Sequence, residues 1–457
     1  MTEQLKLKLN DSKATRWGAL VIVAFTMMAA YYVNDVVAPL KTMLETDLAW
    51  SSTDFGFFTG GYSFLNVFFL MLIWGGLILD RFGIRFTGKL ATILMVGGTA
   101  LEYYAMTGLA GADATLFGIN EILGYKTGVF VAFAGYSIFG VGAEVAGITV
   151  SKIIAKWFKG KELATAMGVQ VALARIGSQA GYAVAIPLAR AFGISTPVLL
   201  GLVLLLGGMI AFFIFAVMDK KLDKQMEAAA IAAGTEDEEE KFSFKDVKNI
   251  LVNPGFWLIA LLCVLFYSCV FPFQKFASEL MIIKYGINEN VAGTFAGLPA
   301  LGALILTPVF GGFIDKRGKS ASIMLLGSAM LICVHFIYAI PDINYWLVAI
   351  VLMIILGIAF SLVPSAMWPA VAKIFPVSQL GTAYALIFFI QNIGLWGIPT
   401  LIGWVLDAYC ISGKKPDGTN MYDYTVPMCI FTGIACLSLI VALLLKKADK
   451  KYGYKLE

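Results

Sequence analysis

A carboxylate and a guanidinium lie inside two long apolar runs of this sequence, Glu144 in FGVGAEVAG and Arg175 in LARIG. At 1.5 Å per helical residue, Arg175 is about 18 Å from the start of its run near Leu163. Glu144 is about 12 Å from the basic segment at Lys152. An arginine can hold a carboxylate through two parallel hydrogen bonds, and a glutamate can accept hydrogen bonds from an ammonium group. The two residues therefore predict a site for a zwitterion.

The same two side chains can instead bind each other. A charge at mid-depth of a membrane costs at least about 2.5–3.5 kcal/mol, so it needs a partner or a water-filled cavity. A salt bridge between Glu144 and Arg175 that locks two helices together meets this need as well as a ligand does. The sequence leaves both interpretations open, and a ligand can exchange for such a bridge.

The composition indicates what surrounds these charges. The chain is 59% hydrophobic and 14% charged, which is too apolar for a soluble core. Twelve apolar runs are each near the roughly 20 residues that cross a bilayer. They lie at 17–40, 54–79, 88–107, 127–150, 162–190, 196–218, 255–284, 290–313, 320–340, 344–366, 378–405 and 425–446. We therefore expect an all-α protein with twelve transmembrane helices embedded in a lipid bilayer.

Charged segments divide the chain into five parts. We expect an N-terminal segment at 1–16, six helices within 17–218, a solvated linker at 219–254, six helices within 255–446 and a tail at 447–457. Basic residues cluster in the links after the second, fourth and eighth spans and near both ends, so both termini are expected in the cytoplasm. These short clusters form no continuous basic face, which argues against nucleic acid as a partner.

An internal repeat supports the two six-helix halves. Residues 155–177 (AKWFKGKELATAMGVQVALARIG) align without a gap with residues 372–394 (AKIFPVSQLGTAYALIFFIQNIG). Such repeats are typical of transporters whose site lies between the two copies. The position that matches Arg175 is Asn392, preceded by Gln391. Their amides can donate to and accept from a polar ligand opposite the charged wall.

A second repeated motif follows the second span of each half. GLILDRFGIR at 76–85 matches GGFIDKRGKS at 311–320. Small residues allow close helix packing, and an Asp at a helix end can accept hydrogen bonds from a facing helix or a basic side chain. The two copies predict gates, and a single copy would be read only as a basic loop that sets topology. The predicted gating residues are Gly76, Asp80, Arg81, Arg85, Asp315, Lys316 and Lys319.

This duplicated motif resembles the loop signature of the major facilitator superfamily. WFKGKEL with LARIG, FPF at 271–273, and MWPAVA with QLGTAY and IQNIG resemble, more narrowly, its domain-containing protein 1 subgroup, the lysosomal dipeptide transporters of animals. The resemblance implies two six-helix bundles around a central cavity and alternating access. It also implies that Glu144 and Arg175 hold the two termini of a dipeptide.

Other polar and aromatic residues in the spans are secondary candidates for the substrate site, each with a plainer alternative. Phe271, Trp368 and Tyr384 can shape side-chain pockets or simply pack. Lys275 can face the cavity or pair with Glu279 four residues on. Asp35, next to Asn34, can line the cavity, take part in proton coupling or mark a polar helix end. Gln170 can support Arg175 or pack.

The sequence therefore predicts a secondary transporter of dipeptides or similar small zwitterions, either a uniporter or coupled to protons. A superfamily exchanger of small carboxylates or drugs is the alternative. No catalytic cluster or metal-ligand set is present, so we expect neither an enzyme nor a cofactor. We expect a monomer in the inner membrane of a prokaryote, because the N-terminus lacks the dileucine signal expected of a lysosomal member.

Overall fold

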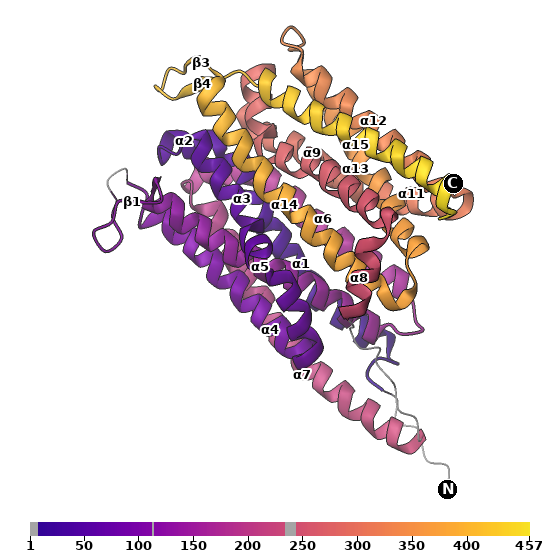
Figure 1. Ribbon diagram of the computed structural model, residues 1–457. Coiled ribbons are helices and arrows are strands. Elements are labelled where there is room, and N and C mark those ends of the chain that lie inside the picture. The colour runs from indigo at the N-terminus through magenta and orange to yellow at the C-terminus, as the bar shows by residue number, and fades with distance from the viewer. Residues whose placement is uncertain (1–7, 112–113, 234–243) are drawn as a thin grey trace.

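The computed structural model describes residues 8–111, 114–233 and 244–457. They form a bundle of long helices with two small hairpins (Figure 1). The first half comprises α1 (Lys13–Val36), η1 (Ala38–Leu40), α2 (Lys41–Asp47), α3 (Ser52–Phe68), α4 (Met71–Thr107), β1 (Glu121–Ile122), β2 (Tyr125–Lys126), α5 (Thr127–Trp157), α6 (Leu163–Phe192) and α7 (Thr196–Ala233). After α8 (Phe244–Val252), the second comprises α9 (Pro254–Tyr285), α10 (Glu289–Ala296), α11 (Leu298–Arg317), α12 (Ser320–Ala339), α13 (Trp346–Ile374), α14 (Val377–Tyr409), β3 (Ile411–Lys414), β4 (Asn420–Tyr422) and α15 (Thr425–Tyr452).

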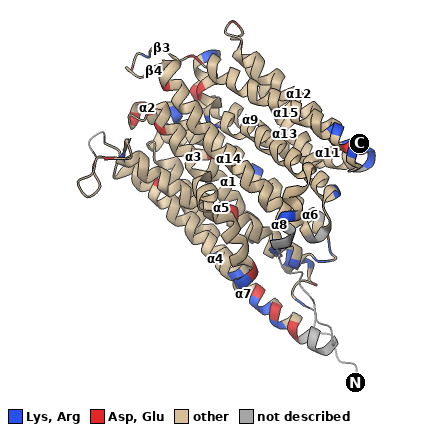
Figure 2. Ribbon diagram, viewed as in Figure 1, with Lys and Arg blue, Asp and Glu red and all other residues tan. Residues whose placement is uncertain are grey.

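Each half packs as its own bundle. In the first half α1 packs on α6 and α7, and α4 packs on α5; in the second, α9 packs on α14 and α15, and α11 packs on α13. The halves meet mainly where α3 contacts α14 and where α6 contacts α10 and α11. Charged residues gather towards the two ends of the bundle, and the middle is largely uncharged (Figure 2). This distribution suits a protein that spans a bilayer.

The predicted spans all fall on helices. Among the described residues, nine helices are long and apolar enough to cross a membrane, and the pair α3 and α4, bent by 58°, also passes that test. Polar residues such as Gln170, Arg175 and Gln179 lower the hydropathy of α6, which is not among the nine. With α6 and the two crossings made by α3 and α4, the helices account for the twelve predicted spans.

The reversal between the second and third spans lies inside α4, at Gly83. This glycine has φ 75° and ψ 174°, a conformation that residues with a Cβ rarely adopt. A Cβ at Gly75 would lie 2.5 Å from Val145 Cγ2, and a Cβ at Gly142 would lie 2.7 Å from the Ala91 carbonyl oxygen. Segments before and after Gly83 thus contact the same level of α5, so the chain doubles back between them.

Two other boundaries differ from the sequence prediction. The eighth span is broken into α10 and α11 at Gly297, close to Gln179 of the first half. The sixth, expected to end at 218, continues as α7 to Ala233 and projects beyond the bundle (Figure 1). The linker predicted at 219–254 therefore begins and ends in helix, and residues 234–243 lie outside the described residues.

The two ends of the bundle differ in how the halves meet. The terminal end holds the start of α1, the C-terminus, the Gly83 turn and the loop at 158–162. There Lys161 donates to Asp11 and keeps the pKa of that carboxyl below its usual range. The hairpin end holds α2 and the β3–β4 hairpin. The ion pairs that join described residues of the two halves lie at the hairpin end or beside the central cavity.

Candidate functional site

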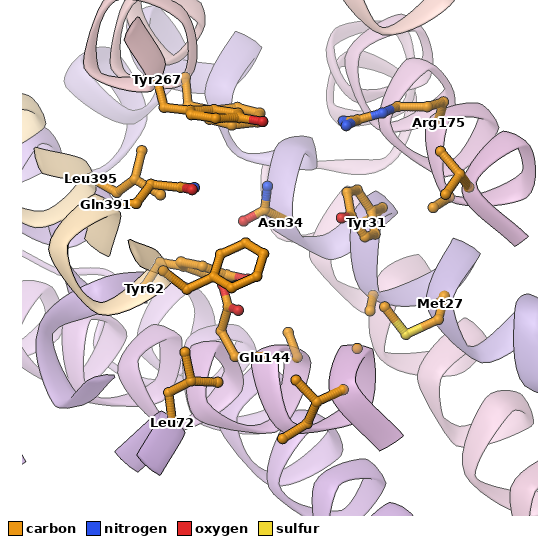
Figure 3. Close-up of a pocket in the computed structure, with 18 of the residues that line it drawn as sticks. Met27, Tyr31, Asn34, Tyr62, Leu72, Glu144, Arg175, Tyr267, Gln391 and Leu395 are labelled. Carbon is orange, nitrogen blue, oxygen red and sulfur yellow. The ribbon is translucent and has the colours of Figure 1, made fainter. Parts of the chain in front are cut away.

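A cavity of about 580 Å³ lies between the two halves (Figure 3). Side chains from α1, α3, α4, α5, α6, α9, α13 and α14 line it. Most of the predicted substrate-binding residues are among them, although they come from distant parts of the sequence. The predicted residues in the lining are Glu144, Gln170, Arg175, Phe271, Lys275, Trp368 and Gln391.

Glu144 and Arg175 lie on different walls of the cavity and do not pair. Arg175 projects into the cavity, and its guanidinium carbon lies 5.6 Å from the ring centre of Tyr31 and 4.9 Å from that of Phe360. Glu144 Oε1 accepts a hydrogen bond of 3.1 Å from the Tyr62 hydroxyl. No described residue forms an ion pair with either side chain. The alternative of a structural salt bridge between them is therefore not realised in this structure.

Glycines beside these two charges bring the neighbouring helices close. A Cβ at Gly140 would lie 2.0 Å from the Tyr62 carbonyl oxygen, so α5 and α3 are in backbone contact four residues before Glu144. A Cβ at Gly177, two residues after Arg175, would lie 2.1 Å from the Met28 carbonyl oxygen. These contacts fix α5 against α3 and α6 against α1. The two charged side chains are thereby carried on rigid, closely packed helices.

Lys275 has different partners from those that its sequence position indicated. Its Nζ lies 3.2 Å from Asp35 Oδ1 on α1 and 2.6 Å from the Asn34 carbonyl oxygen. Glu279 pairs with Lys41 at 2.5 Å instead. Of the two alternatives for Lys275, the pair within α9 is wrong, because Asp35 of α1 pairs with Lys275 and Lys41 of α2 pairs with Glu279. Asp35 itself does not line the cavity but is buried behind Lys275.

The wall from the second half is formed by amides and aromatic rings. Gln391 lines the cavity and accepts from the Cys263 thiol at 3.4 Å. Trp368 stacks on Phe388 with ring centres 4.8 Å apart, and its carbonyl oxygen accepts from the Tyr384 hydroxyl at 3.1 Å. Tyr384 is thus placed behind Trp368, outside the lining.

Asn392 does not face the cavity as its alignment with Arg175 indicated. It is 1% exposed, and its side-chain amide donates to the Phe388 carbonyl oxygen at 3.0 Å. One residue along a helix turns a side chain by about 100°, so Gln391 takes the lining position and Asn392 points into the packing.

Four tyrosines that the sequence analysis did not single out also line the cavity: Tyr31, Tyr62, Tyr136 and Tyr267. Tyr62 binds Glu144, and the Tyr136 hydroxyl donates to the Asn34 carbonyl oxygen at 2.7 Å. Tyr136 precedes Glu144 by eight residues, a spacing that places both on one side of a helix. That spacing was a usable signal for Tyr136, whereas Tyr31 and Tyr267 stand in aromatic-rich runs without a distinguishing pattern.

The predicted gating residues of the first half lie together at the terminal end. Asp80 accepts from Lys152 of α5 at 3.1 Å, and Arg85 lies 3.0 Å from Asp223 of α7. The Arg81 guanidinium carbon lies 5.5 Å from the ring centre of Phe82. Gly76, expected at a close helix contact, has no atom within 4 Å of the position of a Cβ. The close approach occurs at the neighbouring Gly75.

The matching motif in the second half ends α11. Lys316 is exposed near the end of that helix, and Lys319 is an exposed residue with φ 63° at the start of α12. The side chain of Asp315 lies outside the described residues. The second gate therefore stays a prediction.

A buried charge cluster joins the halves at the hairpin end. Lys41 Nζ lies 2.5 Å from Glu45 and 2.5 Å from Glu279, and the Tyr424 hydroxyl donates to Glu279. Lys415 lies 3.5 Å from Glu45 and 3.7 Å from Glu279. The Lys41 side chain is 1% exposed and that of Glu279 is 0% exposed. We call these five residues the hairpin-end cluster, and it was not foreseen from the sequence.

Comparisons with known proteins agree with this architecture. The chain matches the family model of the Major Facilitator Superfamily over residues 20–399 and 284–453. Two solved structures share the fold. The nucleoside transporter NupG has a TM-score of 0.69 and 12% sequence identity, and the match covers 93% of this chain and 98% of that one. An inward-facing bacterial homologue of the human lysosomal transporter Spinster has a TM-score of 0.63 and 15% identity, and the match covers 96% of this chain and 97% of that one. At these identities the likeness shows the fold alone.

Curated relatives are more similar in sequence. The human lysosomal dipeptide transporter MFSD1 is 29% identical over 409 residues, which cover 86% of this chain and 81% of the relative. Its counterpart from Gallus gallus is 33% identical over 287 residues, or 60% of this chain and 62% of the relative. The resemblance to the superfamily and to its domain-containing protein 1 subgroup is confirmed. This chain belongs to the Major Facilitator Superfamily and is an integral, multi-pass membrane transporter.

Proposed function

We propose that this transporter moves dipeptides, or zwitterions of similar size, by alternating access between its two halves. The observation that carries the proposal is the placement of Arg175 and Glu144 on different walls of one cavity without an ion pair between them. Two half-buried charges of opposite sign are stabilised when one ligand supplies both counter-charges. A dipeptide does so with its carboxylate and its ammonium group. The cavity volume of about 580 Å³ is in the usual range for small-molecule sites.

Alternating access is supported by the arrangement of the halves. The hairpin-end cluster, the buried contact between Gly56 and Gly403, and the Thr53 amide donating to Asp407 at 2.6 Å all join the halves at one end. The proposed cycle breaks these contacts and forms equivalent ones at the terminal end. We propose that both termini lie in the cytoplasm, which would make this arrangement the state open towards the cytoplasm. We place the protein, as a monomer, in the inner membrane of a prokaryote.

Ligand binding to the purified protein tests the proposed substrate class. Dipeptides such as alanyl-alanine are expected to raise the Tm, because a ligand that binds only the folded state stabilises it by RT ln(1 + [L]/Kd), or about 2.7 kcal/mol at one hundred times Kd. N-acetylated and C-amidated versions lack one terminal charge each and should lose most of the shift. Equal shifts with capped and free dipeptides would refute the two-ended site.

The same assay separates the alternative substrate class. An exchanger of small carboxylates uses Arg175 but has no need of Glu144. Such a protein would be stabilised by N-acetylated dipeptides, which keep the carboxylate, as well as by free ones. Loss of the shift with N-acetylation but not with C-amidation would instead indicate an amine site.

Asp80→Asn tests the gate at the terminal end. In this structure the Asp80–Lys152 pair is exposed at 66% and 39%, and exposed pairs are worth about 0.2–1 kcal/mol. The substitution is expected to shift the balance between conformational states by roughly 1.5- to 5-fold and to slow dipeptide uptake by liposomes. The dipeptide-induced Tm shift should change little. Uptake at the wild-type rate would mean that this loop only sets topology.

A further inference from the structure

A second pair of buried charges lies beside the Arg175–Glu144 cavity. Lys275 lines the cavity, and its Nζ lies 3.2 Å from Asp35 Oδ1. The two side chains are 10% and 11% exposed and belong to α9 and α1, so the pair joins the two halves. It therefore combines a cation at the cavity surface with a carboxylate directly behind it.

Asp35 accepts hydrogen bonds from two neutral side chains in addition to its contact with Lys275. Its Oδ2 accepts from Ser178 of α6 at 2.6 Å, and its Oδ1 accepts from the Asn34 side chain at 2.9 Å. The Tyr136 hydroxyl of α5 lies 3.4 Å from Lys275 Nζ. If the Lys275 contact is lost, hydrogen bonds from the neutral side chains of Ser178 and Asn34 still hold Asp35 in place.

The other ionisable groups around Asp35 are few. Tyr31 on α1 and Tyr182 on α6 lie near enough to interact with its charge, as does Tyr136 on α5. The part of α7 from Thr196 to Met218 contains no ionisable residue. Lys275 is therefore the charged group in contact with Asp35 among the described residues.

Glu102 on α4 is a third carboxyl close to this pair. It is 0% exposed, and neither of its oxygens has a hydrogen-bond partner among the described residues. It does not line the cavity. Among the described residues Lys275 therefore has Asp35 as its ion-pair partner, and Glu102 is a buried carboxyl that does not pair with it.

The charges around the cavity balance when it holds a neutral zwitterion. Arg175 and Lys275 supply two positive charges, and Glu144 and Asp35 supply two negative ones. A dipeptide with an acidic side chain brings one further negative charge. A net charge in a buried site is costly, so a compensating proton is favoured. Asp35 can accept that proton, and Lys275 is then free to pair with the side-chain carboxylate of the ligand.

We propose that Lys275 and Asp35 form a proton-linked subsite for the acidic side chain of a dipeptide, in which Lys275 transfers from Asp35 to the ligand carboxylate and Asp35 binds one proton. The proposal rests on the proposed function, in which Arg175 and Glu144 hold the two termini. Neutral dipeptides leave the Lys275–Asp35 pair intact and take no proton. Acidic dipeptides enter together with one proton, so that the occupied site stays neutral.

Proton uptake on binding tests the subsite directly. Purified protein in weakly buffered detergent solution with a pH indicator is mixed at pH 7 with saturating alanyl-alanine or alanyl-glutamate. The expected result is about one proton per protein bound with alanyl-glutamate and none with alanyl-alanine. By linkage, the Kd for alanyl-glutamate should rise up to tenfold per pH unit, and the Kd for alanyl-alanine should stay level.

Two amide variants make a matched comparison. Asp35→Asn removes the proposed proton acceptor and should abolish proton uptake with alanyl-glutamate. Glu102→Gln changes a carboxyl that is more deeply buried, at 0% exposed against 8% for Asp35, and that does not pair with Lys275, so it should take up protons like wild type. Should Asp35→Asn fail to fold, Lys275→Met serves instead: it has no cation that can transfer from Asp35 to the ligand, so it should show no proton uptake with alanyl-glutamate.

The outcomes separate this inference from the proposed function. Equal proton uptake with both dipeptides, or none with alanyl-glutamate, overturns the subsite while dipeptide binding still stands. So does uptake that survives in Asp35→Asn or Lys275→Met, or uptake that disappears in Glu102→Gln. If neither dipeptide binds wild type, the proposed function itself fails.

Discussion

Replacing Arg175 with alanine is expected to lower dipeptide uptake by roughly 30- to 5,000-fold. Removal of one partner from a buried charge contact typically costs about 2–5 kcal/mol, and each 1.36 kcal/mol is a factor of ten in rate. Arg175 projects into the cavity and is held over Tyr31 and Phe360 without an ion partner among the described residues, so the fold does not depend on its charge. The measurement is initial uptake of labelled alanyl-alanine by liposomes, with the Tm of the free protein as a check on folding.

Arg175→Lys and Glu144→Gln complete this test. Lysine keeps the charge but loses the two parallel hydrogen bonds, so its uptake should fall between those of wild type and Arg175→Ala. Glu144→Gln should instead lose the preference for a dipeptide over its analogue without the α-amino group. If Glu144→Gln discriminates as well as wild type does, Glu144 is a structural partner of Tyr62, and the carboxylate exchanger becomes the better proposal.

Much of the fold follows from local properties of the sequence. Apolar run length gives the spans, and the repeat at 155–177 and 372–394 indicates the two halves. The apolar runs at 54–79 and 88–107 imply a reversal between them, and the structure places it at Gly83, whose non-helical φ and ψ angles separate the two helical parts of α4. The charged segment after 218 gave no sign that α7 continues to Ala233, because its alternating charges are compatible with either a linker or an exposed helix.

The candidate site was foreseen only in part, for a physical reason. A charge in an apolar run is visible in the sequence, so Glu144, Arg175 and Lys275 were all identified as candidates. Which charges pair depends on how helices far apart in the chain are placed. Lys275 has Glu279 at the favoured helical spacing, yet it pairs with Asp35, 240 residues away. Pairing across the two halves cannot be read from spacing within one helix.

The hairpin-end cluster is the clearest case of such long-range pairing. Lys41 and Glu279 are 238 residues apart and lie in different halves, and both are almost fully buried. In the proposed cycle this end of the bundle must open, which exposes both side chains to water. The cluster then contributes only to the state seen here, so its loss should shift the balance between the two states.

Lys41→Met is therefore expected to open the hairpin end. The substitution leaves Glu45 and Glu279 buried together, and Lys415, at 3.5 and 3.7 Å, is then the one cation paired with them in the part of the chain that the structure describes. Removal of one partner of a buried pair costs about 3–5 kcal/mol, so the balance should shift towards the open hairpin end by roughly 150- to 5,000-fold. Hydrogen exchange measures this shift: amides in α2 and in the β3–β4 hairpin should exchange faster than in wild type.

Arg190→Met is the matched control, because it removes a second ion pair between the halves at the same end. Arg190 pairs with Glu289, but both side chains are 42% exposed, and an exposed pair contributes only about 0.2–1 kcal/mol. Its exchange rates should stay within a few-fold of wild type. If Arg190→Met opens this end as much as Lys41→Met does, burial is not what gives the cluster its strength. If Lys41→Met leaves exchange in α2 and the hairpin unchanged, the apolar contacts between α3 and α14 hold this end closed, and the cluster is not its gate.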